Sequence, residues 1–365
     1  MLGLFGIVGA LLAGLVADSM IGGLMGKTDD DDDGPSGAPQ DAATETETPV
    51  SGPDLLDWPG EDADPDTDAG DNPANPGPDD PDFVPRSSDL PSPDDPVLTL
   101  LGGGADDILS GLGGNDTLAG GDGDDQLTGR GGDDFIQGGS GNDIAHGGEG
   151  ADLVQGGTGD DQLAGENGDD RLVGGEGSDA LSGHEGEDSL YGGAGADTVL
   201  GGGGDDQLIG GDAGDWLAGG LGDDHLVGDA GRDELDGGAG NDVLDGRETF
   251  TAFPEADFLN GGEGDDLLYV GAGDYATGGG GADLFKLSDL AAGDAVANIA
   301  DYDAAADRLV VVFDPAIHPD PQLSLETPEN SDDVLVLLDG VPLAMVQGGA
   351  GMTLADVLLT PAQAA

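Results

Sequence analysis

The residues with the clearest chemical potential in this sequence are aspartates that recur every nine positions. Each follows a glycine-rich segment and precedes a short stretch with one aliphatic residue, as in Gly120–Thr128 (GGDGDDQLT) and Gly156–Ala164 (GGTGDDQLA). A carboxylate and the carbonyl oxygens of a turn form a hard ligand set made only of oxygen atoms, which suits Ca²⁺. Mg²⁺ fits less well, because it retains its waters and demands a stricter geometry. The spacing therefore predicts a series of calcium sites.

The candidate ligands are the aspartates at the sixth position of each unit. From Gly102 to Asp245 the sequence divides without a gap into sixteen nine-residue units, and two more occupy Gly261–Tyr269 and Gly278–Lys286. In the sixteen contiguous units the first position is always glycine and the sixth always aspartate, and the eighth is Leu, Ile or Val in fifteen. The predicted metal ligands are Asp107, Asp116, Asp125, Asp134, Asp143, Asp152, Asp161, Asp170, Asp179, Asp188, Asp197, Asp206, Asp215, Asp224, Asp233, Asp242, Asp266 and Asp283.

The same repeat predicts the elements that position these aspartates. Three glycines within four residues mark a turn, and the next three residues, such as Gln126–Thr128, suffice for a short strand with its aliphatic side chain inward. Two units then make one coil of eighteen residues, and stacked coils make two parallel sheets around an aliphatic column. Because units two apart share an edge, Asp107 and Asp125 are predicted on one edge. Asp116 and Asp134 are predicted on the other.

These edges require a cation. Stacked aspartates lie ~5 Å apart, and many units add a carboxylate at the fifth position, as at Asp106, Asp124, Asp133 and Asp160. One buried aliphatic side chain contributes ~1.5–3 kcal/mol, whereas ordering nine residues costs on the order of 1–2 kcal/mol for each. Bound metal must supply the difference. Sixteen units have fourteen neighbours on a shared edge, so up to about fourteen ions could bind between coils.

Composition excludes several classes of protein. The 365 residues carry 78 acidic and 8 basic side chains, a formal net charge of −70, which leaves no basic footprint for a nucleic acid. The absence of cysteine excludes disulfides, cysteine-ligated zinc and a cysteine nucleophile. Aromatic residues make up only 4% of the chain, which is too few for the core of a conventional enzyme domain.

Composition also divides the chain into four predicted parts. Residues 1–26 are almost entirely apolar, and residues 27–96 form an acidic, proline-rich linker that we expect to be disordered. Residues 97–286 carry the repeats. In residues 287–365, short runs of Val, Leu and Ile predict a small C-terminal β domain.

The apolar segment 1–26 allows three interpretations. No Lys or Arg precedes its uncharged stretch, so a signal peptide would be atypical. Small residues recur at spacings that let membrane helices pack closely, which favours a membrane-associating helix. A soluble self-associating helix is the third interpretation.

An insertion at 246–260 interrupts the repeat and holds Phe250, Phe253 and Phe258. These phenylalanines either close the end of the roll or form an exposed aromatic contact for a partner or a sugar.

Other positions depart from the repeat or extend it. Five units replace the second glycine with Leu112, Arg130, Glu166, His184 or Asp229, where a side chain should strain the turn and weaken the site. Beyond the repeats, Asp301, Asp303 and Asp307 either bind one more Ca²⁺ or serve as turn residues between strands.

The units resemble the glycine-rich nonapeptide of RTX (hemolysin-type) calcium-binding proteins, whose consensus is G-G-x-G-x-D-x-U-x with U aliphatic. The resemblance covers residues 102–245 in phase and resumes at Gly261–Tyr269 and Gly278–Lys286. It implies an all-β, right-handed parallel β-roll in which the sixth-position carboxylate and turn carbonyls bind Ca²⁺ between coils. It also implies export by a type I secretion system through an uncleaved C-terminal signal. Residues 281–309 resemble the region that follows the repeats in such exported proteins.

We therefore expect a non-enzymatic, extracellular calcium-binding protein, secreted or displayed at the cell surface, that folds on Ca²⁺ after export. Its expected partners are the type I secretion machinery and, through residues 1–26, a membrane or cell surface. Two alternatives stay open: a carrier module of an extracellular enzyme that acts on a polymer, and an adhesin or surface-layer protein. No acid–base or nucleophile constellation favours an enzyme, and the sequence identifies no small-molecule substrate.

Overall fold

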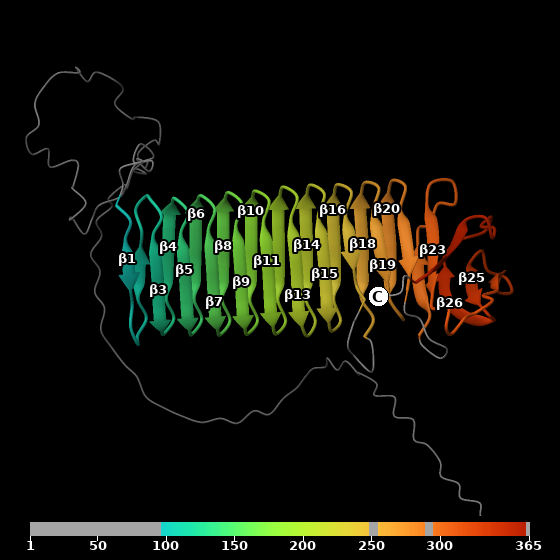
Figure 1. The fold of residues 1–365 in the computed structure, drawn as a ribbon, viewed down its shortest axis with the longest axis horizontal. Coiled ribbons are helices and arrows are strands. Elements are labelled where there is room, and N and C mark those ends of the chain that lie inside the picture. The colour runs from blue at the N-terminus through green and yellow to red at the C-terminus, as the bar shows by residue number, and fades with distance from the viewer. Residues whose placement is uncertain (1–95, 248–254, 289–294, 363–365) are drawn as a thin grey trace, which may run out of the picture. The chain divides into compact units, whose positions relative to one another are not determined.

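The computed structural model describes residues 96–247, 255–288 and 295–362 (Figure 1). Within these ranges the regular secondary structure consists of β-strands only, and the strands form two sheets. These ranges contain no helix that could cross a membrane. The predictions for residues 1–26 and for the linker up to residue 95 fall outside the described residues, as do Phe250 and Phe253.

Successive strands alternate between the two sheets. Sheet A contains, in spatial order, β1 (Thr99–Leu101), β3 (Thr117–Asp122), β5 (Phe135–Ser140), β7 (Leu153–Thr158), β9 (Arg171–Glu176), β11 (Ser189–Ala194), β13 (Gln207–Asp212), β15 (His225–Ala230), β17 (Val243–Asp245), β19 (Leu267–Val270), β21 (Leu284–Leu287), β23 (Arg308–Phe313) and β27 (Val357–Pro361). Sheet B contains β2 (Ile108–Ser110), β4 (Gln126–Gly131), β6 (Ile144–Glu149), β8 (Gln162–Asn167), β10 (Ala180–Glu185), β12 (Thr198–Gly203), β14 (Trp216–Leu221), β16 (Glu234–Ala239), β18 (Phe258–Glu263), β20 (Tyr275–Gly280), β22 (Ala297–Ala300), β26 (Val341–Val346), β25 (Val334–Leu338) and β24 (Leu323–Glu326).

The pairing follows the nine-residue period of the sequence. Neighbouring strands of the repeat region are parallel. From β1 to β17 their partners are eighteen residues apart, as in Leu118 with Ile136 and Ile136 with Val154. The separation is 24 residues across the insertion and 17 across the shortened turn. Equivalent positions therefore stack in straight rows along each sheet. This register confirms the predicted coil of two units and the two parallel sheets.

The strands are longer than the sequence predicts. Most have six residues rather than three, because the first glycines of the next unit continue the extended ladder, as in β4. Even turn residues bond between coils: the N–H of Gly123 donates to the carbonyl of Ser140 at 2.8 Å. Glycine has no side chain to block this close approach of neighbouring coils. The backbone ladder thus spans nearly the whole coil.

The core of the repeat region is a single column of eighth-position side chains. Leu118, Leu127, Ile136, Val154 and their equivalents are completely or almost completely buried. The two sheets contribute to this column alternately, because each successive unit adds one residue to it. The prediction of one inward aliphatic side chain per unit is correct.

The C-terminal strands belong to the same two sheets. Strand β23 pairs parallel with β21 and β27 in sheet A, and β22 pairs parallel with β20 and β26 in sheet B. Strands β24 and β26 then flank β25 in antiparallel pairs. The segment expected as a C-terminal β domain therefore extends the sheets of the roll and ends sheet B with antiparallel strands (Figure 1).

Candidate metal centre

The sixth-position aspartates form two rows, one at each edge where the chain passes between the sheets. Each lies directly before a strand, with its side chain turned inward. We call these rows the aspartate ladders. The first ladder contains Asp107, Asp125, Asp143, Asp161, Asp179, Asp197, Asp215, Asp233, Asp257 and Asp274. The second contains Asp116, Asp134, Asp152, Asp170, Asp188, Asp206, Asp224, Asp242, Asp266, Asp283 and Asp307.

One oxygen of each carboxylate joins neighbouring coils. The backbone N–H of Asp125 donates to Oδ1 of Asp143 at 2.8 Å, and that of Asp134 donates to Oδ1 of Asp152 at 2.7 Å. The same bond repeats along both ladders, always from one aspartate to its equivalent in the next coil. Because each turn is bonded to the next through its aspartate, the ladders fix the register of the turns.

The other carboxylate oxygen is buried without a hydrogen-bond partner along most of both ladders. The aspartates concerned are 1–3% exposed, and burial of an unsatisfied polar atom costs ~1–3 kcal/mol. These Oδ2 atoms belong to Asp125, Asp134, Asp143, Asp152, Asp161, Asp170, Asp179, Asp188, Asp197, Asp206, Asp215, Asp224, Asp242 and Asp266. So many equivalent unsatisfied oxygens indicate that the ladders are built to bind a cation.

A backbone carbonyl oxygen lies beside many of these carboxylate oxygens. A β-carbon built on Gly192 would lie 2.5 Å from Oδ2 of Asp197 and 2.7 Å from the carbonyl oxygen of Gly210 in the next coil. No real β-carbon approaches other atoms this closely, so the first position of the unit must be glycine. The two oxygens border the same small space, and together they are the hard donors that Ca²⁺ prefers. The residues present therefore fit the metal that the sequence predicts.

The donors are a mixture of side-chain and backbone oxygens. Among residues 96–247, 255–288 and 295–362, no three His, Cys, Asp or Glu side chains converge into a metal cluster. A calcium ion bound here would take backbone carbonyl and water oxygens beside the carboxylates, as is usual for calcium.

Burial of the carboxyl group raises the pKa of many ladder aspartates above the ordinary value of 3.8, and the backbone hydrogen bond offsets part of this rise. The pKa reaches about 7 for Asp134, Asp161, Asp170, Asp215 and Asp224. It reaches about 6 for Asp152, Asp197, Asp206 and Asp266. Neighbouring aspartates add smaller Coulombic contributions of the same sign. A bound cation would stabilise the ionised form and reverse this shift.

The carboxylates near the ends of the ladders are better satisfied. Oδ2 of Asp107 accepts a hydrogen bond from the N–H of Gly103 at 2.8 Å, and Oδ2 of Asp116 accepts one from Leu112 at 3.2 Å. At the other end, Oδ2 of Asp307 accepts one from the N–H of Asp303 at 2.7 Å. These carboxylates have less need of a cation than those in the middle of the roll.

The structure places all eighteen predicted aspartates in the two ladders. It adds Asp257 and Asp274, which sequence reasoning missed, and Asp307, for which the sequence left a calcium ligand and a turn residue as alternatives. The N–H of Asp233 bonds Asp257 at 2.8 Å and that of Asp283 bonds Asp307 at 3.0 Å, so both ladders continue past the regular repeats. The signal was present in the sequence, because each added aspartate precedes a residue and then an inward apolar one, as in Asp307-Arg308-Leu309. Asp257 and Asp307 lack the preceding glycines of the repeat, and Asp274 lies in a segment one residue shorter than a unit, which hid the matches.

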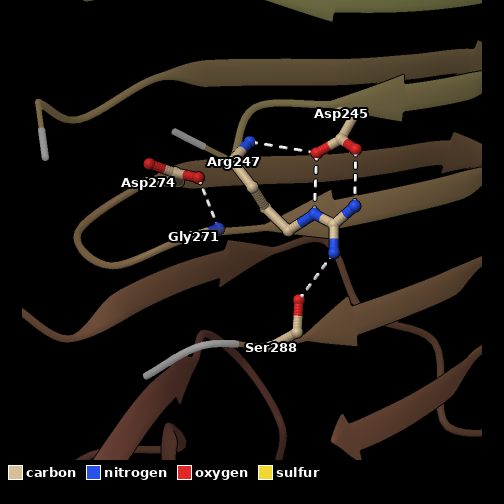
Figure 2. Close-up of polar contacts among 5 residues, drawn as sticks. All are labelled: Asp245, Arg247, Gly271, Asp274 and Ser288. Carbon is tan, nitrogen blue, oxygen red and sulfur yellow. Dashed lines mark hydrogen bonds and ion pairs between the residues drawn. The ribbon is translucent and has the colours of Figure 1, made fainter. Parts of the chain in front are cut away.

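Two irregular turns precede Asp257 and Asp274 (Figure 2). The insertion begins after β17, where the guanidinium group of Arg247 bonds both carboxylate oxygens of Asp245 at 2.8 and 2.6 Å and Oγ of Ser288 at 3.1 Å. The shortened turn after β19 closes through the N–H of Gly271, which donates to Oδ2 of Asp274 at 2.6 Å. Both irregularities stay within turns, so the strands on either side keep their register.

The interpretation of Asp301 and Asp303 as turn residues matches the structure. The carboxylate of Asp301 accepts N–H bonds from Gly278 at 3.1 Å and Gly279 at 2.9 Å, and Oδ1 of Asp303 accepts one from Ala305 at 2.9 Å. These backbone donors satisfy the carboxylates between β22 and β23.

The fifth-position side chains form an exposed outer row with the opposite bond direction. The N–H of Asp124 donates back to Oδ1 of Asp106 at 3.1 Å, whereas in the ladders each aspartate N–H donates forward. On the first edge these bonds end where the N–H of Ser178 donates to Asp160, but on the second edge they recur, with gaps, as far as the bond from Ala282 to Asp265. The two edges therefore have equivalent aspartate ladders but different outer rows.

The predicted strain is present at four of the five second-position side chains and is absent at Leu112, whose φ is not positive. Positive φ angles occur at Arg130 (83°), Glu166 (84°), His184 (83°) and Asp229 (71°), a region that non-glycine residues rarely adopt. These turns store strain that a glycine would avoid.

A family model described as the RTX calcium-binding nonapeptide repeat matches residues 101–136, 137–172, 146–181, 173–208, 209–244 and 245–275. No curated protein matches the chain. Among solved structures, the chain is similar to a hyperactive, Ca²⁺-dependent, β-helical antifreeze protein from an Antarctic bacterium, at 17% sequence identity with a TM-score of 0.29. That likeness covers 63% of this chain and 86% of the other and is too distant to carry an argument. The family match confirms the resemblance that rests on residues 102–245.

Proposed function

Residues 101–275 belong to the RTX calcium-binding nonapeptide repeats, and we propose that the protein is a secreted or surface-displayed β-roll that folds when it meets Ca²⁺ outside the cell. The observation that carries the proposal is the series of buried, unsatisfied Oδ2 atoms along the aspartate ladders. Such atoms are costly in a metal-free protein and become ligands in a calcium-bound one. Metal binding and folding are then a single event.

The ligands in this proposal are the Oδ2 atoms of sixth-position aspartates and the carbonyl oxygens of first-position glycines one coil further on. The bound ion supplies positive charge that neutralises the stacked carboxylates. Up to about fourteen ions could bind, one for each pair of neighbouring units on an edge. We expect the weakest sites at Asp107 and Asp116, because backbone donors already satisfy their Oδ2 atoms.

The affinity expected for such sites connects folding to location. Extracellular calcium modules bind at ~10⁻⁴–10⁻³ M, well above the free calcium of a cytosol. The chain would remain unfolded before export and would fold afterwards. We propose type I export through a C-terminal signal on the strength of the family and of residues 281–309.

A non-enzymatic role is part of the proposal. It rests on the sequence, which offers the C-terminal residues 287–365 no acid–base or nucleophile constellation. A screen of the calcium-bound protein against soluble polysaccharides and peptides for hydrolysis products would overturn this part if it found turnover.

Far-UV circular dichroism during a calcium titration tests the main proposal. The β signal should be weak in chelator and should rise cooperatively near millimolar Ca²⁺, while the same concentration of Mg²⁺ produces little. A full β signal in chelator, or an equal effect of magnesium, contradicts the proposal.

Export is tested separately in a host that carries the secretion system. Deletion of residues 305–365 should abolish appearance of the protein in the medium, and deletion of residues 29–94 should not. If the protein lacking 305–365 still reaches the medium and loss of residues 1–26 prevents export instead, the type I assignment is wrong.

A further inference from the structure

An exposed row of aromatic side chains crosses the outer face of sheet B. Trp216, Glu234, Phe258, Tyr275 and Asn298 occupy the same position of successive strands, β14 to β22, and lie opposite one another in register. Trp216 is 41% exposed, Phe258 37% and Tyr275 47%. Phe258 thus points to solvent from a strand and does not close the end of the roll. Large aromatic side chains held this open to water mark a contact surface.

Two hollows lie along this row and share Glu234 and Phe258. One has a volume of about 440 Å³ and lies between Trp216, Arg232 and Phe258. The other has a volume of about 280 Å³ and is lined by Phe258 and Tyr275 together with polar side chains. We call the two hollows and their lining the aromatic groove. Four strand spacings of ~4.8 Å give it a length of ~19 Å, enough for several units of a chain molecule.

A row of hydrogen-bonding groups runs beside the aromatic row. The hydroxyl of Thr277 donates to Oδ1 of Asn260 at 3.0 Å, and the amide of Asn260 donates to Oδ1 of Asp236 at 2.8 Å. These bonds orient the three side chains, and each group has further donor or acceptor capacity. The 280 Å³ hollow also includes Asn298 and Gln347. An apolar ridge flanked by oriented amides, carboxylates and hydroxyls suits a ligand with both C–H surfaces and many hydroxyl groups.

The groove lies where the outer acidic row of the first edge has ended. Beyond Asp160 the fifth position on this edge is Ser178, Ala196, Gly214 and Arg232. The guanidinium group of Arg232 stacks over the ring of Phe258 at 4.9 Å, and the rings of Phe258 and Tyr275 are stacked at 5.2 Å. The fifth-position row beside the groove is therefore less acidic than that of the opposite edge, where Asp205 and Asp223 continue the row.

We propose that the aromatic groove binds a neutral polysaccharide. The net charge of −70 disfavours polyanions such as nucleic acids, anionic lipid surfaces and polyuronates. A neutral sugar chain avoids this repulsion, packs its C–H groups on Trp216, Phe258 and Tyr275, and bonds its hydroxyls to Glu234 and Asp236. The proposal goes beyond calcium binding and requires of it only that the roll be folded.

Affinity electrophoresis of the full chain in excess Ca²⁺ tests the proposal, with hydroxyethylcellulose, laminarin, galactomannan and dextran as probes. Circular dichroism first establishes that each protein is folded, so a failure to fold on calcium is distinguished from a failure to bind sugar. At least one probe should retard the protein. Trp216→Ala, and separately Phe258→Ala with Tyr275→Ala, should weaken retardation at least tenfold. The matched control is Tyr191→Ala on sheet A, where an aromatic side chain is 43% exposed outside the groove and its loss should change retardation less than twofold.

A second measurement leaves the groove intact, so it tests sugar binding even if the groove variants fail to fold. The sequence contains two tryptophans, Trp58 and Trp216, so Trp58→Phe leaves Trp216 as the only tryptophan reporter. Its emission should shift on addition of a hexasaccharide of the retarding polysaccharide. The proposal is overturned if none of the four probes retards the folded protein. It is also overturned if the groove variants are retarded like Tyr191→Ala, or if only alginate or a peptide shifts Trp216 emission.

Discussion

The repeat region and the C-terminal strands share two continuous sheets but are held together differently. Each unit of the repeat region buries one aliphatic side chain, and its edges bury carboxylates whose second oxygen lacks a partner. The C-terminal strands β22 to β27 bury apolar side chains more densely, among them Val334, Val336, Leu338, Leu343 and Val346.

The carboxylates of the two regions also differ in how far protein hydrogen-bond donors satisfy them. In the C-terminal region, Asp339 accepts bonds from His318 at 2.6 Å and from the N–H of Gln322 at 2.7 Å. Asp356 likewise accepts bonds from the N–H and the hydroxyl of Thr353. One fold can thus contain a segment that needs a metal and a segment that its own contacts stabilise.

The largest expected effect is the separate response of the two regions to chelator. Hydrogen exchange with mass spectrometry should show residues 108–280 exchanging rapidly without Ca²⁺, because one apolar contact per unit does not offset chain entropy. Amides of β25 and β26 should retain protection, since dense apolar burial does not depend on metal. Equal loss of protection in both regions would show that the C-terminal strands depend on the folded roll.

The next effect is an opposite pH dependence of the two regions in chelator. In the roll, burial raises the pKa of Asp161 and Asp170 to about 7. Acid therefore favours the metal-free folded roll: this stabilisation is full below the unfolded pKa of 3.8 and is lost as pH rises through 7. In the C-terminal region, the side-chain bond from His318 lowers the pKa of Asp339, and backbone and side-chain bonds from Thr353 lower that of Asp356. Their stabilisation is present above the unfolded pKa and is lost as pH falls through the lower folded value.

Hydrogen exchange at pH 8 and pH 5 in chelator measures this difference when each rate is divided into the intrinsic rate at that pH to give a protection factor. Protection factors in the roll should be higher at pH 5, whereas those of the C-terminal strands should stay constant, because both pH values lie above the unfolded pKa of Asp339 and Asp356. With saturating Ca²⁺ the sign should reverse in the roll, because protons compete with the metal for the same oxygens. A metal-free roll that is more stable at pH 8 than at pH 5 would contradict the raised pKa values.

A smaller effect distinguishes the inner ladder from the outer row. Asp170→Asn should raise the calcium midpoint of folding by roughly tenfold, or about 1.4 kcal/mol, because it removes charge from a buried ligand between the coils of Asp152 and Asp188. Its neighbour Asp169 provides the matched control, since its exposed carboxylate accepts a bond from the N–H of Glu187 at 3.0 Å. Asp169→Asn should shift the midpoint less than twofold. Equal shifts would place the calcium ligands in the outer row as well.

The smallest effect concerns strain within the roll. His184→Gly should stabilise the calcium-bound protein by about 1 kcal/mol, because glycine adopts a φ of 83° without steric cost. The control is His225→Gly at the start of β15, because His225 does not have a positive φ and glycine should destabilise the strand there. Urea denaturation at fixed Ca²⁺ measures the free energy of unfolding of both variants. If His184→Gly does not increase this free energy, the turn at His184 is unstrained.

The sequence alone determined much of this architecture, since a strict nine-residue period fixes which residues stack. Position six became a ladder and position eight a core column because parallel coils in register repeat every contact. The eighteen predicted aspartates therefore lie where the period places them, from Asp107 to Asp283. Their role as ligands follows from the same period and the chemistry of oxygen donors, and remains a prediction.

Tertiary structure decided what the period does not encode. Asp257, Asp274 and Asp307 joined the ladders only because irregular turns absorb the extra or missing residues while the strands stay paired. The C-terminal runs of Val and Leu could have formed a separate domain, but pairing of β21 with β23 continued the existing sheet edge, where unpaired N–H and C=O groups were available. The aromatic groove likewise has no signature in a single unit. Trp216, Phe258 and Tyr275 become neighbours only when coils stack, because contacts across a sheet join residues far apart in the chain.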